Sequence, residues 1–156
     1  MKNPLSSGDR YDRAYFDRWY RDPKTRVKSG AAIRRKAALA LSVAEYYLER
    51  PVRSVLDVGC GEGNWLTALR SLRPKIRYTG VDASRYAVER FGKKRNIRLG
   101  SFANLDEIGL ANDYDLIVCS DTLFYLPIEE LALGLASLAY RAAGVAFLEL
   151  YTDGDS

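Results

Sequence analysis

The run VLDVGCGEGNW, from Val55 to Trp65, decides the fold class of this 156-residue chain. A short apolar, β-branched segment leads into three glycines at alternate positions, and a helical pattern follows to about Leu72. Glycine permits the tight turn from strand to helix and lets a ligand approach bare backbone. The run therefore predicts a nucleotide-binding loop at the tip of a strand.

An acidic residue in the right place strengthens this interpretation. Asp82 ends the next predicted strand, where one strand-helix-strand unit would bring its carboxylate to the ribose hydroxyls of a nucleotide. The loop spacing is GxGxG rather than the GxGxxG of dinucleotide sites, and Asp57 and Glu62 would repel phosphates. We expect a nucleoside ligand without phosphates, which disfavours an NAD-dependent oxidoreductase.

The rest of the chain repeats the same alternation of strand and helix. This pattern is typical of an α/β fold with a parallel sheet and helices on both faces. We expect strands at 52–58, 76–81, 97–99, 114–119 and 145–151, and helices at 64–72, 84–91 and 127–143. Gly144 is expected to separate the last helix from the last strand. Two helical segments, an aromatic one at 11–20 and a longer one at 31–49, precede this core.

The composition limits the chemistry and the location. The chain has no histidine, and its two cysteines, Cys60 and Cys119, have neither disulfide-framework nor zinc-ligand spacing, so no metal site is expected. No apolar run is long enough to span a membrane and the start lacks a signal-peptide pattern, so we expect a cytoplasmic protein. The first third of the chain is basic, which leaves binding to RNA open as an alternative, although we expect no nucleic-acid partner.

Several segments resemble the motifs of class I methyltransferases that use S-adenosylmethionine (AdoMet). Val55–Gly63 resembles their motif I, Gly80–Ser84 their second motif, and Leu99–Phe102 the segment that lies on adenine. Asp115–Leu126 resembles motif IV of small-molecule and NodS-like members. The resemblance implies a Rossmann-like open sheet of order 3-2-1-4-5, with S-adenosylhomocysteine (AdoHcy) as the product. It implies one domain over 1–156, with a basic, aromatic lid at 1–50 and a core at 51–156.

The resemblance also implies roles for individual residues. The Gly59–Gly63 backbone would hold the methionine portion, Asp82 the ribose, and Ser120 and Asp121 the floor beneath the sulfonium. The implied cofactor-binding residues are Asp57, Gly59, Cys60, Gly61, Gly63, Asp82, Ala83, Ser84, Ser101, Phe102, Ser120 and Asp121. The candidate catalytic residues are Asp121 and Tyr125, and the candidate lid residues are Tyr11, Tyr15, Trp19 and Tyr20.

The expected reaction is methyl transfer to an oxygen or nitrogen of a small molecule by in-line displacement. The sulfur leaves without charge, so no acid is needed to protonate it, which suits a chain without histidine. The last two strands of the family, an antiparallel pair, have no counterpart in this sequence. A silent AdoMet-binding domain or a fragment acting through a partner is therefore the alternative, and an exposed sheet edge would allow a dimer.

Overall fold

The structure, a computed structural model, describes residues 11–25 and 30–150 of the chain. Its sheet has five parallel strands in the order β3-β2-β1-β4-β5, which confirms the predicted Rossmann-like architecture. The strands are β1 (Ser54–Val58), β2 (Arg77–Asp82), β3 (Ile97–Leu99), β4 (Tyr114–Cys119) and β5 (Ala142–Leu148). The strand order reverses between β1 and β4, which is where open α/β sheets form their ligand crevice.

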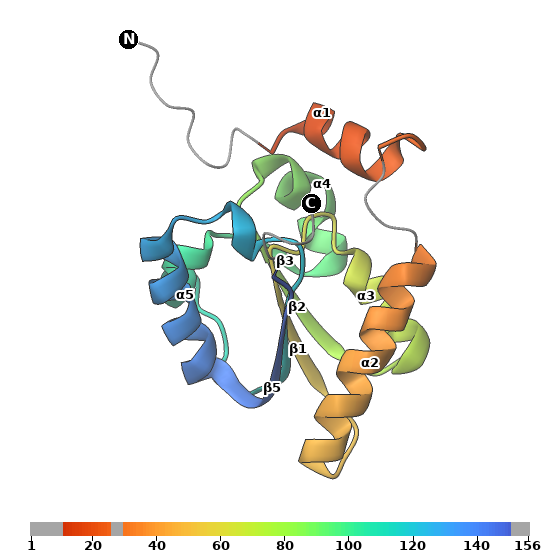
Figure 1. The fold of residues 1–156 in the computed structure, drawn as a ribbon, viewed down its shortest axis with the longest axis vertical. Helices are drawn as coiled ribbons and strands as arrows, with labels where there is room; N and C mark the ends of the chain where they lie inside the picture. The colour runs from red at the N-terminus through yellow and green to blue at the C-terminus, as the bar shows by residue number, and fades with distance from the viewer. Residues whose placement is uncertain (1–10, 26–29, 151–156) are drawn as a thin grey trace.

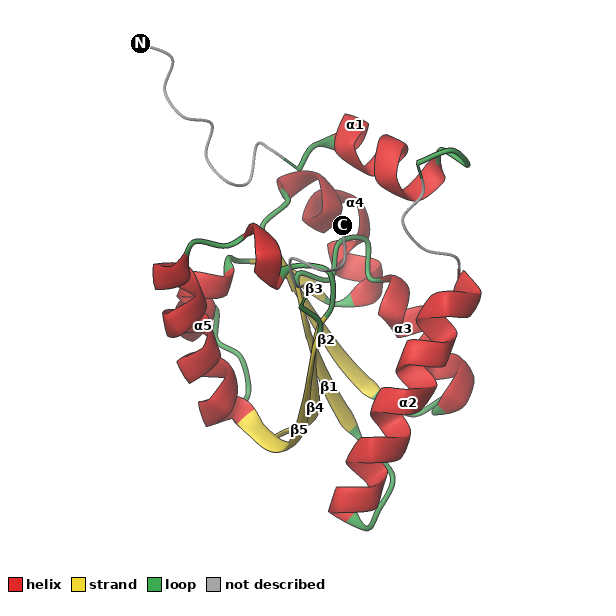
Figure 2. Ribbon diagram, viewed as in Figure 1, coloured by secondary structure: helices red, strands yellow, loops and turns green. Residues whose placement is uncertain are grey.

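Helices cover both faces of this sheet. Figure 1 shows the sheet between α2 and α3 on one side and α5 on the other, and Figure 2 shows α1 beyond the strand ends near α4. The helical elements are α1 (Arg13–Phe16), η1 (Asp17–Arg21), α2 (Gly30–Leu48), α3 (Asn64–Leu72), α4 (Arg85–Arg95), η2 (Phe102–Glu107), η3 (Leu123–Tyr125) and α5 (Ile128–Arg141). Of these, η1 is a π-helical turn, while η2 and η3 are 3-10 helices.

The two central strands are buried along their whole length because both of their faces are covered. Every residue of β1 and β4 is buried, as expected for apolar strands in the middle of a parallel sheet. Val55 and Val118 belong to the core shared with α2 and α3, whereas Leu56 and Ile117 face the core under η2 and α5. This alternation holds β1 rigidly between two layers, so the loop that follows it has a fixed base.

One buried carboxylate ties the amino ends of β1 and β4 together. Asp115 accepts hydrogen bonds from the backbone N–H groups of Arg53 (2.6 Å) and Ser54 (3.2 Å) and pairs with Arg50 at 2.6 Å. The Arg50 guanidinium holds the pKa of Asp115 below its usual value. This acid of the motif IV segment therefore supports the sheet at the end away from the glycine loop.

The position predicted for Gly144 is wrong. Gly144 lies inside β5 rather than before it, because β5 already begins at Ala142. The register of β4 and β5 shifts between Tyr114 and Leu116, and the Asp115 carbonyl lies so close to Gly144 that no Cβ would fit there. Gly144 therefore lies where the backbones of β4 and β5 approach each other closely, which is a common reason for a glycine within a strand.

Strand β5 forms one edge of the sheet within the described residues. Its side chains carry no charge, and Ala143, Ala146 and Leu148 are exposed. The other edge strand, β3, is only three residues long and carries Arg98. In residues 11–25 and 30–150 no helix combines the length and hydrophobicity needed to cross a bilayer.

The packing of α5 on η2 can be tested at Gly134. A Cβ at this position would overlap the ring of Phe102, so we expect Gly134→Ala to lower the free energy of unfolding by about 1–3 kcal/mol. Helix propensity alone would give a gain of about 1 kcal/mol. Denaturant unfolding measures the free energy of unfolding of the variant and of the wild type. Ala136→Gly, on the exposed face of α5, is the control for helix propensity. A stabilised Gly134→Ala variant would contradict this packing.

Candidate functional site

The glycine loop sits at the carboxyl end of β1 and is tied to the end of β2. Gly59, Gly61 and Gly63 all have positive φ values, of 73°, 54° and 78°. The N–H groups of Gly59 and Cys60 both donate to the carbonyl of Val81, at 2.8 and 3.1 Å. The loop therefore turns back over β2 before α3 begins, as the spacing of the glycines predicts.

Asp82 is buried beside this loop, at the end of β2. Its carboxylate accepts hydrogen bonds from the N–H of Gly61 (2.6 Å) and from the N–H of Ser84 (2.9 Å), one on each oxygen. Burial raises the pKa of Asp82, while these two hydrogen bonds lower it. Each oxygen keeps a second lone pair, which a hydroxyl donor of a ligand can use.

Asp57 lies beneath the same loop, at the base of the site. It is 1% exposed and accepts a hydrogen bond of 2.7 Å from the hydroxyl of Tyr78. Burial raises the pKa of Asp57 to about 7, the Tyr78 hydrogen bond lowers it, and the charge of Asp82 raises it further. Within residues 11–25 and 30–150, neither carboxylate forms an ion pair with a Lys or Arg.

The N-terminal helical segment packs directly on the glycine loop. The Tyr20 hydroxyl lies 2.5 Å from the point that a Cβ on Gly61 would occupy, and the Phe16 ring lies 3.4 Å from it. Phe16 is buried between Tyr20 and Tyr86, with ring centroids at 5.0 and 5.5 Å. Burial of its hydroxyl raises the pKa of Tyr20 well above the usual value. The segment therefore packs on the glycine loop, while its role as a lid stays a prediction.

Polar contacts hold the segment in place from two sides. Arg21 pairs with Glu62 of the loop at 2.5 Å, and the Ser84 hydroxyl donates to the carbonyl of Tyr11 at 2.5 Å. Tyr15 packs edge-on against Tyr11, with ring centroids 5.1 Å apart. Trp19 is half-buried under the Arg18 guanidinium, 4.9 Å from the ring. Phe16 and Arg21 were not among the lid residues predicted from the sequence, although both lie within or directly after the aromatic run.

The residues predicted near adenine have structural partners of their own. Ala83 is half-buried directly after β2, while Ser84 caps α4 by accepting from the N–H of Ala87 at 3.1 Å. Ser101 forms a capping box with Asn104 at the start of η2. Phe102 is buried against Gly134 of α5. Contact of these residues with adenine stays a prediction.

A polar cluster follows the carboxyl ends of β4 and β5. The Ser120 hydroxyl lies 2.5 Å from a carboxylate oxygen of Glu149 and 3.2 Å from Asp121, and Lys36 of α2 pairs with Glu149. Asp121 has a φ of 60°, in the left-handed region that non-glycine residues seldom adopt. The backbone of Tyr125 lies in η3, and its side chain is outside the described part of the structure. Glu149, which the sequence analysis missed, belongs to this cluster.

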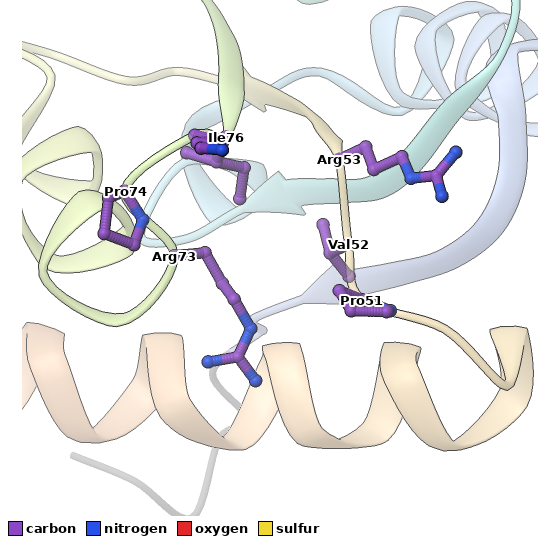
Figure 3. Close-up of a pocket in the computed structure, with 7 residues that line it drawn as sticks. Pro51, Val52, Arg53, Arg73, Pro74 and Ile76 are labelled. Atoms are coloured by element: carbon purple, nitrogen blue, oxygen red, sulfur yellow. The ribbon is translucent and has the colours of Figure 1, made fainter.

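A cavity of about 330 Å³ lies at the opposite end of β1 and β2. Figure 3 shows Pro51, Val52 and Ile76 among its lining residues, with the Arg73 side chain reaching toward the neighbouring helix. Arg73 is held there by Glu45 of α2, at 2.7 Å. The cavity is therefore separate from the glycine loop and the two buried carboxylates.

Comparison with known proteins identifies the same architecture. A family model described as a methyltransferase domain matches residues 30–153. A sugar N-methyltransferase from Streptoalloteichus sp. ATCC 53650 has a TM-score of 0.68 at 23% identity, with 100% of this chain and 60% of that one covered. PKMT2 from Rickettsia typhi, solved in complex with AdoHcy, has a TM-score of 0.57 at 27% identity, over 72% of this chain and 24% of that one.

Two further proteins are similar to this chain, one of known structure and one known only by its sequence. A plantazolicin methyltransferase in complex with SAH, which is the same compound as AdoHcy, has a TM-score of 0.60 at 24% identity, with 80% of this chain and 51% of that one covered. An uncharacterized protein of Rickettsia prowazekii (strain Madrid E) is 29% identical over 107 residues, which are 63% of this chain and 42% of that protein. The chain thus spans about half the length, or less, of the curated relative and of this plantazolicin enzyme.

The contact between the N-terminal segment and the glycine loop can be tested with a double-mutant cycle. We expect Gly61→Ala to lower the free energy of unfolding by about 1–3 kcal/mol, because its φ of 54° is unfavourable for alanine and its Cβ would meet the Tyr20 hydroxyl. In a Tyr20→Phe background that hydroxyl is gone, so the loss should shrink by about 0.5–1 kcal/mol. Denaturant unfolding of the four proteins measures the coupling. Strictly additive effects would show that the segment does not rest on the loop.

Proposed function

This chain belongs to the methyltransferase domain family, and on that premise we propose that it binds AdoMet and transfers the methyl group to an oxygen or nitrogen atom of a small molecule. The observation that carries the proposal is the pair of buried carboxylates, Asp57 and Asp82, around a loop of bare backbone. AdoHcy, the product of methyl transfer from AdoMet, is bound in two of the structures that are similar to this chain, which supports the choice of cofactor.

The charges of the site suit this cofactor. A buried carboxylate without a cationic partner is costly, and among the described residues Asp57 and Asp82 have none. A ligand that brings an ammonium group and a sulfonium would supply the missing positive charge. Asp82, already oriented by two backbone N–H groups, would accept from ribose hydroxyls. A pyrophosphate in the same place would meet two negative side chains.

The residues around the glycine loop would position the acceptor for methyl transfer. When bound, AdoMet supplies an electrophilic methyl group whose sulfur leaves uncharged. The chain must therefore align the acceptor and exclude water rather than donate a proton to the leaving group. Asp121, at the carboxyl end of β4, would orient the acceptor and hold the proton that it loses. Tyr125, three residues before α5, is the second candidate for that task.

The acceptor is proposed to be a small molecule. Two proteins of similar fold are, by their names, a sugar N-methyltransferase and a plantazolicin methyltransferase, and the first of these names supports a small acceptor with a nitrogen atom. We also propose that residues 11–25 form the lid over the core, as Tyr20 and Phe16 lie against the loop. The absence of a nucleic-acid partner, a cytoplasmic location and a dimer through the sheet edge stay predictions.

Binding of the cofactor should depend on Asp82. We expect the full chain to bind AdoHcy in calorimetry, and Asp82→Asn to weaken that binding by roughly 30- to 100-fold, because hydrogen bonds from two hydroxyls to a charged acceptor are weakened. The control is Asp113→Asn, an exposed carboxylate at the amino end of β4. Equal affinities of Asp82→Asn and the wild type, or binding of NADH in place of AdoHcy, would contradict the proposal.

Transfer itself is tested with AdoMet carrying a labelled methyl group. We expect label in an amino sugar or another small amine or alcohol, and its loss in Asp121→Asn. Binding of AdoHcy without label in any acceptor of these classes would favour a silent AdoMet-binding domain that acts through a partner.

The ion pair between lid and loop should slow cofactor release. Arg21→Ala removes the partner of Glu62, so we expect AdoHcy to dissociate about five-fold faster, the equivalent of roughly 1 kcal/mol. Stopped-flow displacement measures the rate. Arg13→Ala is the control, because among the described residues Arg13 forms an ion pair with Asp17 of its own helical segment alone, and the two side chains are 77% and 45% exposed. Identical release rates in both variants and the wild type would show that this pair does not hold the lid.

A further inference from the structure

Tyr78 lies under the glycine loop and holds one of the two buried carboxylates. Its residue position in β2 pairs with Val55, two residues before Asp57, so its ring runs along the strands toward their carboxyl ends. The hydroxyl reaches Asp57 at 2.7 Å, and both side chains are almost completely buried, at 5% and 1% exposure. A hydrogen bond so far from water is worth more than one at the surface.

The same tyrosine touches the loop from below. Its hydroxyl lies 3.6 Å from the point that a Cβ on Gly63 would occupy, and its ring lies 3.2 Å from the corresponding point on Gly80. Tyr78 therefore connects the acid beneath the loop to the last glycine before α3. The carboxyl of Asp57 and the hydroxyl that binds it therefore lie next to the backbone on which the cofactor would rest.

The groups that face Asp57 include no described cation. They are Tyr78 and Asp82 of β2, Cys60 of the loop and Cys119 of β4. The first turn of α3, Asn64 to Leu66, has no ionisable side chain. Burial raises the pKa of Asp57 to about 7, and the Tyr78 hydrogen bond opposes that rise. The carboxyl is thus divided between its neutral and charged forms near neutral pH.

We propose that Tyr78 is a positioning residue whose hydroxyl favours the charged form of Asp57, so that binding of the cofactor's ammonium group releases a proton from this buried pair. The inference rests on the proposed function. A ligand with a positive charge binds the carboxylate form better than the neutral form, so its affinity rises with pH until Asp57 is fully ionised. Removing the tyrosine hydroxyl shifts that rise to higher pH, because the carboxylate loses its donor.

The experiment is calorimetric titration of the full chain with AdoHcy between pH 5.5 and pH 8.5. For the wild type we expect the affinity to rise up to ten-fold per pH unit and to level off above about pH 7. In Tyr78→Phe the rise should move upward by about one pH unit, so that binding is roughly five-fold weaker at pH 7 and recovers at pH 8.5. Asp57→Asn should remove the pH dependence.

A control variant, a control ligand and a direct measurement of proton release distinguish an effect of Tyr78 on the ionisation of Asp57 from an effect on the fold. Tyr114→Phe removes the hydroxyl of another buried tyrosine, at the amino end of β4, and should leave the profile unchanged. 5′-Methylthioadenosine lacks the ammonium group and should bind with little pH dependence. Titration in two buffers of different ionisation enthalpy should show release of about half a proton per AdoHcy at pH 7 in the wild type.

The outcomes distinguish the inference from the proposed function. Superimposable pH profiles of the wild type and Tyr78→Phe, or the same slope in Asp57→Asn, would overturn the role of Tyr78 while AdoHcy binding leaves the proposed function standing. A wild type that binds AdoHcy at no pH would overturn the proposed function itself. A Tyr78→Phe protein that binds weakly at every pH, with an unshifted profile, would show that the tyrosine only supports the fold.

Discussion

The site depends on the meeting of two parallel strands at their carboxyl ends. β1 and β2 pair in register from Ser54 with Arg77 to Val58 with Val81, so the residues that follow them emerge side by side. This brings the glycine loop against Asp82, and the Val81 carbonyl binds two N–H groups of the loop. A helix or an antiparallel pair would not present backbone and carboxylate in this arrangement.

The two buried carboxyl groups, Asp57 and Asp82, are surrounded by hydrogen-bond donors. Charged carboxylates in a low-dielectric interior lose solvation, and the chain offsets part of this cost with hydrogen bonds from Tyr78, Gly61 and Ser84. These donors fix the orientation of Asp57 and Asp82 without neutralising them. A positively charged ligand therefore gains more here than at a surface.

The N-terminal segment and the polar cluster both lie at the carboxyl ends of the strands. Phe16 and Tyr20 come from a segment about forty residues before the loop they cover, whereas Ser120, Asp121 and Glu149 come from the ends of β4 and β5. Lys36 of α2 pairs with Glu149 and so connects the long helix to the cluster. Segments far apart in the sequence thus meet at the carboxyl ends of the strands.

The sequence by itself determined the alternation of strands and helices and the positions of Gly59–Gly63 and Asp82, because each depends on local periodicity and on the short spacing of one βαβ unit. The order of the sheet followed only from the resemblance to class I methyltransferases, because periodicity does not record which strands become neighbours. Only the tertiary structure decided that Tyr78 binds Asp57, that Arg21 binds Glu62 and that Glu149 joins Ser120. These contacts join residues 21 to 41 positions apart, and no pattern in one strand or helix records which side chain will meet it. Gly144 shows the same limit, because a glycine that lets two backbones approach has the same signature in the sequence as one that ends a helix.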